Sequence, residues 1–545
     1  MHSFTDRPHT SLSKSRLQIG LHTVRKKQSL ASHRENTFIW YILALAIAAG
    51  IFFRLYNLDK KVFWLDETIS ASHISGTTYE WHSLLRTENP IEVKELLTFQ
   101  IPNEKRGLKD TIQSLIELEP IHAPLYYCLL YFWAKYVGYS VLMLRLLSAL
   151  IGLVQIAAIF WLCFELSGTH YLGMLAASLL SLSPILVVYA QETREYSLFA
   201  VAAIVLSACF LRAVRKQNLR GWIAYSLCLI FALYTSLLTI LVMAGQLIYL
   251  LLEKGMKWKQ FGKFFAAWAF AFVAYFPWLA VVWEHLELGA NGIHWLLNPA
   301  SLCDLLSIWN ANFAGALFDP GHLSAPFQVL MGAVVLVELF AAVEMCRKSS
   351  RVAKFVLTLI ATNSLPLMIL DLAVGGRCSV PPRYQTAATI GIVVLVAYLF
   401  YIKLRGKTDA QQLAWRVAFS ILLLTGLFSC AICSQATTWR EKPLGGDFVA
   451  IARIVNEEPL PALLVTYEDE RHTNSRQMLV ISHLLTPTNK ILLLKKPGIP
   501  RLDPGMTHFF AYDLPPNYRQ YFEGSGRFIV TQIDKIPKLH RVDCK

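Results

Sequence analysis

Long runs of apolar residues, separated by short polar or basic segments, dominate the chain between residues 37 and 436. A helix needs about 20 apolar residues to cross a hydrocarbon core about 30 Å thick. Nine runs have about this length, and they cover residues 37–56, 143–165, 170–189, 195–214, 264–283, 325–345, 355–373, 385–402 and 417–436. A further run, 222–252, is 31 residues long with Tyr234, Thr235 and Ser236 near its middle, which predicts a hairpin of two spans. The pattern therefore predicts eleven membrane-spanning helices.

Lysine and arginine gather in the segments between these runs. Residues 1–36 hold seven of them, and residues 212–220, 253–263, 346–354 and 403–416 hold four each. Short basic segments stay on the cytoplasmic side of a membrane, and eleven spans place all five segments there. The basic N-terminal segment is too long for a signal peptide, and no small-residue cleavage site follows the first apolar run, so 1–36 is expected to remain as a cytoplasmic segment.

One apolar stretch, residues 122–138, is not expected to cross. It begins with His122 and Pro124, is only 17 residues long and contains Lys135. A crossing here would reverse the sidedness of every later basic segment. The stretch is therefore expected to form a helix that lies along the outer membrane surface.

Three pieces outside the apolar runs are expected to face outward: loops 57–121 and 284–324, and a tail of residues 437–545. The tail has short β-like runs between Pro and Gly breaks, which predicts a small extracytoplasmic α/β domain. The predicted fold is a polytopic α-helical membrane protein, with a transmembrane domain over residues 37–436, outer surface helices and this C-terminal domain.

The composition agrees with this topology. Hydrophobic residues make up 55% of the chain and charged residues 16%, against about 25% charged in soluble proteins, so a disordered chain, a coiled coil and an ordinary water-soluble enzyme are excluded. The net charge of +14 would suggest nucleic acid in a soluble protein, but here 23 of the 51 Lys and Arg residues lie in the five cytoplasmic segments and orient the helices. The ten scattered cysteines support neither a zinc ribbon nor a disulfide framework.

Four clusters of polar residues fall on the predicted outer side, two of them near the first outer loop. Asp66 and Glu67 follow Trp64 and are suited to a general base and its neighbour, or to two solvated acids beside an interfacial Trp. Glu119 and His122 stand three residues apart and are weak candidates for a metal site, with the start of a surface helix as the alternative.

The other two clusters lie between spans. Residues 189–196 place five polar or charged groups in a turn between apolar helices, which suits either a functional site or a structural Arg–Glu pair. Residues 377–384 carry Arg377 and Arg383 on the outer side, where an arginine suits a lipid phosphate by a charge-assisted bidentate contact. All four clusters share one side of the membrane, which favours a composite site at the outer leaflet.

These residues resemble the GT-C superfamily of polyprenyl-phosphate-sugar glycosyltransferases. The nearest branch is the glycosyltransferase family 39-like group, kin of the protein O-mannosyltransferases and the lipid A aminoarabinose transferase. The resemblance covers about residues 37–402, and its motifs are FRLYNLDKKVFWLDE (53–67), HAPLYYCLLYFW with LRLLSALIG (122–152), YAQETREYSL (189–198), YFPWL (275–279) and PPRY (381–384). The chain departs from the family pattern at Ala123, where a Pro is usual, and at Ser236, where many members have a His that could bind metal.

The resemblance implies roles for individual residues. Asp66 would be the catalytic base, with Glu67 as its partner and Glu192 as a second acid. The residues implied for binding the substrate and the lipid phosphate are His122, Arg194, Tyr196, Arg383 and Tyr384.

The resemblance also implies a reaction: transfer of a sugar from a polyprenyl-phosphate donor to a hydroxyl of a protein, lipid or glycan. The expected mechanism is inverting, at the outer face of the plasma (inner) membrane, with a divalent metal ion as a possible cofactor. One alternative is a transporter or flippase for lipid-linked sugars, whose polar mid-span candidates are Asp371 and Asn363. Another is a non-catalytic assembly partner.

Overall fold

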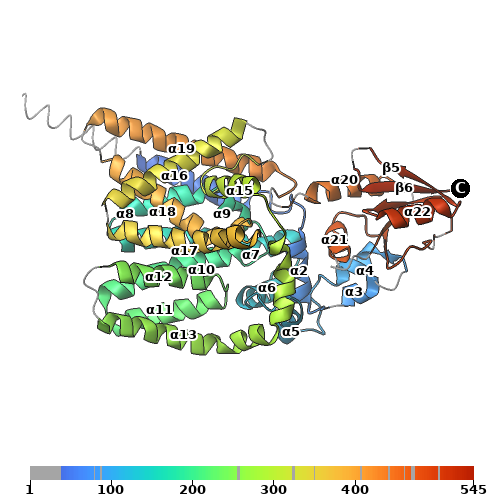
Figure 1. Ribbon diagram of the computed structural model, residues 1–545, viewed down its shortest axis with the longest axis horizontal. Coiled ribbons are helices and arrows are strands. Elements are labelled where there is room, and N and C mark those ends of the chain that lie inside the picture. Colours follow the sequence, from blue (N-terminus) through green and yellow to red (C-terminus); the bar gives the residue numbers. More distant parts are fainter. Residues whose placement is uncertain are drawn as a thin grey trace, which may run out of the picture.

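A computed structural model of the chain describes residues 39–78, 80–85, 89–253, 258–321, 326–348, 350–405, 408–439, 442, 444–458, 461–467, 473–500, 502, 504–534 and 536–545. A bundle of long helices forms one end of the molecule and a small sheet domain the other (Figure 1). The predicted cytoplasmic segment 1–36 lies outside the described residues.

Each apolar run predicted to span is mainly helical over its described residues. In the described residues, seven helices are long and apolar enough to cross a membrane: α7 (Val141–Ser167), α10 (Tyr196–Lys216), α13 (Trp258–Glu284), α16 (Pro326–Lys348), α17 (Arg351–Val374), α18 (Thr386–Lys403) with the short η2 (Pro382–Gln385) before it, and α19 (Asp409–Gln435). Three apolar helices are shorter: Ile39–Leu55, α11 (Leu219–Leu233) and α12 (Thr239–Leu252). The predicted hairpin at 222–252 is thus two helices. The number of crossings, eleven, stays a prediction.

The run at 170–189 is a broken helix. It consists of α8 (His170–Ser181) and α9 (Pro184–Ala190), bent by 66°. Pro184 has no amide hydrogen and cannot continue the hydrogen-bond ladder of α8, so the carbonyls at the break lose their usual partners four residues further along the helix. The fully buried Arg54 binds two of them, donating to the oxygens of Ser181 at 2.7 Å and Leu180 at 3.1 Å. The turn that follows α9 contacts the loop 57–121, where the Thr193 amide donates to Glu67 Oε1 at 3.0 Å.

Helices of the first outer loop lie between the bundle and the sheet domain (Figure 1). They are α2 (Leu65–Ser75), α5 (Leu108–Leu118) and α6 (Leu125–Tyr136). At 12 residues α6 is too short to span, as predicted for 122–138. One side of it is buried, including Tyr126 and Tyr127, whereas Phe132 and Tyr136 are exposed. The second outer loop contributes α14 (Leu286–Ile293), η1 (His294–Leu297) and α15 (Leu302–Ala314).

The tail forms the predicted α/β domain around a six-stranded sheet. Strands β2 (Leu463–Tyr467), β3 (Lys490–Leu494) and β4 (His508–Tyr512) are parallel, and β5 (Phe528–Gln532) and β6 (Leu539–Cys544) extend the sheet in antiparallel pairs. The helices of this domain are α20 (Leu444–Asn456), α21 (Thr473–Ile481) and α22 (Pro516–Gly524). The inner strands are almost wholly buried because side chains on both faces enter hydrophobic cores.

The sheet also includes a strand from outside the tail. The strand order is β1-β3-β2-β4-β6-β5, and β1 (Ile91–Glu92) belongs to the first outer loop, between α3 (Glu80–Leu85) and α4 (Val93–Thr98). It pairs antiparallel with β3, with Ile91 opposite Ile491. A strand of two residues has no periodicity, so a sheet shared by the first loop and the tail could not be predicted from the sequence.

Candidate active site

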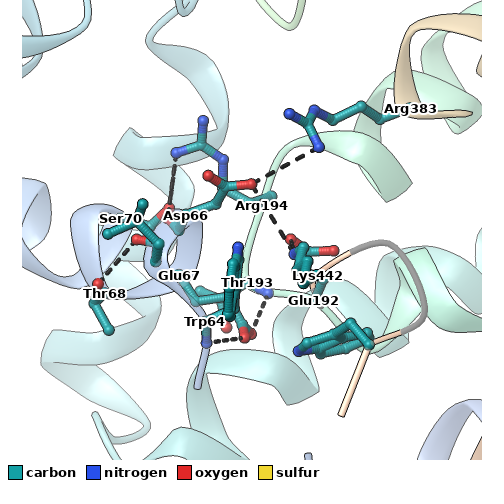
Figure 2. Close-up of polar contacts among 12 residues, drawn as sticks. Trp64, Asp66, Glu67, Thr68, Ser70, Glu192, Thr193, Arg194, Arg383 and Lys442 are labelled. Carbon is teal, nitrogen blue, oxygen red and sulfur yellow. Dashed lines mark hydrogen bonds and ion pairs between the residues drawn. The ribbon is translucent and has the colours of Figure 1, made fainter. Parts of the chain in front are cut away.

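Asp66 is the second residue of α2. It lies in the first turn of the helix, two residues after the N-cap residue Trp64. Its side chain is about one quarter exposed, and one oxygen, Oδ2, is 4.0 Å from both the Arg383 guanidinium and the Lys442 ammonium (Figure 2). Burial by itself would raise the pKa of Asp66, but Arg383, and after it Lys442 and Arg194, hold that pKa below its usual range. Asp66 is therefore an ionised carboxylate that solvent can reach.

Glu67 is fully buried and is bound on both oxygens. Arg145, in α7, donates to Oε1 at 2.8 Å and to Oε2 at 2.7 Å, and the backbone amide of Thr193 donates to Oε1 at 3.0 Å. Burial raises the pKa of Glu67, but the Arg145 pair outweighs burial and lowers it. With its lone pairs used in this way, Glu67 ties α2 to the bundle. Arg145 was not among the predicted site residues, although one charged residue within an apolar span is a recognisable signal.

Glu192 lies in the turn after α9 and is almost completely buried. It forms an ion pair with Lys442 (Figure 2). Burial raises the pKa of Glu192 to about 7; Lys442 opposes this shift, and the nearby charges of Glu67 and Asp66 add to it. Lys442 was also missed, because it stands in the tail, far along the sequence from the motifs it joins.

Arg194, two residues further along the same turn, binds a second group of acids. Its guanidinium lies 3.3 Å from Glu119 Oε2 and 3.1 Å from His122 Nε2. The other His122 nitrogen lies 3.0 Å from Glu195 Oε1. Burial raises the pKa of Glu195, but Arg194 and His122 together lower it to about 2. Glu195 was not among the predicted site residues, although it stands in the turn that was singled out.

Glu119 and His122 do not fit a divalent metal ion. Arg194 already lies between them and supplies the positive charge that a metal would bring. Within the part of the chain that the structure describes, no group of three or more His, Cys, Asp or Glu side chains could hold a metal ion.

Aromatic rings surround Arg383, which lies in η2. The guanidinium carbon is 5.3 Å from the ring centroid of Tyr384, 5.7 Å from that of Trp295 and 5.9 Å from that of Tyr196. Such rings stabilise a cation through their faces. The N–H groups of a guanidinium lie in its own plane, where an anionic ligand can accept hydrogen bonds from them. The structure thus brings Tyr196, Arg383 and Tyr384 together with Asp66.

A cavity of about 330 Å³ adjoins the Glu192–Lys442 pair. Its walls come mainly from α9 and from the end of α19, and they include Ile185, Val188, Ile432 and Ala436. The cavity is therefore mostly apolar with a charged end next to Asp66.

Three other polar residues singled out from the sequence serve local structure. Arg377 is exposed and donates to the carbonyl of Pro299 at 2.9 Å, so it lies apart from the site. Asp371 accepts from the amide of Ser379 at 2.7 Å, and Asn363 donates to the Leu359 carbonyl at 2.9 Å in its own helix.

Known proteins are similar to this chain in sequence and in fold. A sequence model of the family described as dolichyl-phosphate-mannose-protein mannosyltransferase matches residues 121–283. The fold is similar to the crystal structure of ArnT from Cupriavidus metallidurans in the apo state, with a TM-score of 0.52 and 11% identity over 93% of this chain and 98% of that chain. A segment of the chain thus matches this family in sequence, and the whole chain is similar to ArnT in fold. The resemblance predicted from the motifs is confirmed, and the chain is a multi-pass membrane protein.

Two further solved structures are similar to this chain. ArnT from C. metallidurans bound to undecaprenyl phosphate has a TM-score of 0.49 and 12% identity, over 93% of this chain and 98% of that chain. The archaeal oligosaccharyltransferase AglB from Archaeoglobus fulgidus, in complex with an inhibitory peptide and a dolichol-phosphate, has a TM-score of 0.45 and 12% identity, over 84% of this chain and 65% of that chain. No curated protein matches the sequence.

Proposed function

We propose that this protein transfers a sugar from a polyprenyl-phosphate donor to a hydroxyl acceptor at the outer face of the membrane, with Asp66 as the general base. The observation that carries the proposal is the pair of Asp66 and Arg383, 4.0 Å apart, at the edge of the helical bundle. It places a carboxylate held in its ionised form next to a cation suited to phosphate. The matched family's description names dolichyl-phosphate-mannose, which supports a donor of this class.

The reaction then follows from the chemistry of these groups. The acceptor oxygen attacks the anomeric carbon and forms the new C–O bond, while the bond from that carbon to the phosphate oxygen breaks. The acceptor proton passes to Asp66, a role worth about 10²- to 10⁴-fold in rate. The departing polyprenyl phosphate gains negative charge, which Arg383 stabilises. A single displacement inverts the anomeric centre, so a β-linked donor gives an α-linked product.

The other predicted residues take supporting roles. Glu67, whose oxygens Arg145 and two backbone amides occupy, is a positioning residue that fixes the first turn of α2. Glu192 has a pKa of about 7, so its carboxyl group is suited either to donate a hydrogen bond to the substrate hydroxyl or to accept one from it. Tyr196 and Tyr384 frame Arg383. Arg194 holds His122 and Glu119 beside α2. The proposed reaction uses no metal ion.

The placement of the site on the outer side of a plasma membrane is part of the proposal. It is supported by the five basic segments between the spans. Such segments stay on the cytoplasmic side, which leaves the loop with Asp66 on the other side. Donor lipids would then diffuse within the outer leaflet and present their phosphate to Arg383.

A transfer assay with the purified protein tests the proposed function. The donor is a radiolabelled polyprenyl-phosphate sugar, and membrane extracts supply the acceptors. Transfer is expected for the parent and for Asp59→Asn, a matched control at an exposed acid of the same loop. Asp66→Asn is expected to retain a folded structure and to lose at least about 100-fold in rate. Full activity of a folded Asp66→Asn protein would refute the assignment, and movement of unmodified donor across vesicles without transfer would support a flippase instead.

A further inference from the structure

Lys442 brings a cation from the C-terminal part of the chain into the site. It lies between α19 and α20, and only 6% of its side chain is exposed. Its ammonium forms the ion pair with Glu192 and lies 4.0 Å from Asp66 Oδ2 (Figure 2). The rings of Trp439 and Trp64 lie 5.1 Å and 6.0 Å from it. A lysine buried among rings and two carboxylates is fixed in place, unlike a lysine on a surface.

Two hydrogen bonds attach the residues before Lys442 to the backbone of the first outer loop. The Trp439 indole donates to the carbonyl of Val62 at 3.0 Å, and the Val62 amide donates to the carbonyl of Thr437 at 2.9 Å. Val62 stands four residues before Asp66. The pairing of β1 with β3 adds a second connection between this loop and the tail. The position of Lys442 relative to Asp66 is therefore set by the docking of the tail.

Asp66 is faced by several charged groups, and their roles differ. Arg383, Lys442 and Arg194 favour its ionised form, whereas Glu119 opposes it. In the proposed reaction Arg383 binds the donor phosphate, so its charge is shared with a second anion. Lys442 approaches the same carboxylate oxygen as Arg383 and also pairs with Glu192.

We propose that Lys442 is a positioning residue for Asp66: it keeps this carboxylate ionised and in place while Arg383 binds the donor, so that the tail completes the active site. This inference rests on the proposed function. It predicts that loss of the lysine charge makes Asp66 easier to protonate without removing the donor site.

Five variants separate this role from simple folding. Lys442→Met removes the charge, and Lys442→Arg retains it. Because Lys442→Met leaves Glu192 buried without its partner, the double variant Glu192→Gln/Lys442→Met removes both charges and protects the fold, and Glu192→Gln alone is its reference. Lys538→Met is the matched control, since Lys538 pairs with Asp513 on the surface of the tail. Thermal unfolding in detergent confirms which variants are folded.

The first readout needs no activity. The infrared band of the protonated Asp66 carboxyl is identified by its loss in Asp66→Asn and is followed as the pH is lowered. In Lys442→Met this band is expected at higher pH than in the parent, and in the double variant at higher pH than in Glu192→Gln. Lys442→Arg and Lys538→Met are expected to follow the parent. Titration of folded Lys442→Met at the parent's pH, or of the double variant at the pH of Glu192→Gln, overturns the inference.

The second readout is transfer. The loss of kcat/KM in Lys442→Met is expected to grow from less than about threefold near pH 8 to more than about tenfold near pH 5.5, because protonation of the base removes activity. A loss that is equal at all pH values overturns the proposed role. If the parent itself transfers no sugar, the proposed function fails, while the infrared titration still decides whether Lys442 controls Asp66.

Discussion

Arg145 holds both carboxylate oxygens of Glu67 inside the protein, at 2.8 and 2.7 Å. The same guanidinium donates to the carbonyls of Leu58, Lys61 and Val62, so one side chain of α7 fixes both the start of α2 and the chain leading into it. Asp66 is the neighbour of Glu67. The position of the proposed base thus depends on a buried ion pair one residue away.

Breaking this pair is expected to destabilise the protein. Removing one partner of a buried ion pair leaves an uncompensated charge and costs about 3–5 kcal/mol. Arg145→Met and Glu67→Gln should each lower the unfolding temperature in detergent, and the double variant should lose less than the two single losses combined. Arg453→Met, at an exposed residue, serves as the control. Unchanged unfolding of Arg145→Met would show that the pair does not stabilise the fold.

Arg383 is expected to be needed for its shape as well as its charge. Arg383→Met should lower kcat/KM for the labelled donor by about 10²- to 10³-fold, the usual loss when a donor to a developing anion is removed. Arg383→Lys should recover only part of this, because lysine lacks the planar fork that bonds two phosphate oxygens. Arg377→Met, at the exposed arginine bound to Pro299, should be close to the parent. Equal losses in Arg377→Met and Arg383→Met would contradict a specific phosphate contact.

The apolar pattern was sufficient to predict the helical membrane domain, the hairpin at 222–252 and the α/β tail, because each depends on local periodicity and composition. The motifs also placed Asp66, Glu192 and Arg383 in one site. Arg145 and Lys442 could not be assigned in this way, since their partners lie 78 and 250 residues away and only packing brings them together. The break between α8 and α9 was missed for a related reason: Pro184 signals it, but Arg54, which donates to the Leu180 and Ser181 carbonyls there, lies on another helix.

Arg54 gives a prediction about this break. Arg54→Met would remove the side-chain donor of the buried Ser181 carbonyl, at about 1–3 kcal/mol for an unsatisfied group, and would leave the Leu180 carbonyl with backbone amide donors alone. The variant is expected to be less stable, and also less active, because α9 carries the turn with Glu192 and Arg194. Arg54→Lys should recover part of the stability. The measurement is unfolding temperature together with transfer rate, and a full loss of activity at unchanged stability would point to a direct role of Arg54.

Glu192 is expected to make the stability of the protein depend on pH near neutrality. Its pKa rises from an ordinary value of 4.5 to about 7, chiefly through burial. The folded state therefore binds the Glu192 proton more tightly than the unfolded state does, which stabilises the folded state. This stabilisation is full below about pH 4.5 and is lost as the pH rises toward about 7. Other carboxylates, such as Glu195, with its pKa lowered to about 2, act in the opposite sense. The test is thus the difference in unfolding temperature between the parent and Glu192→Gln across this range. The parent should lose stability relative to the variant as the pH rises, and a constant difference would show that Glu192 does not titrate there.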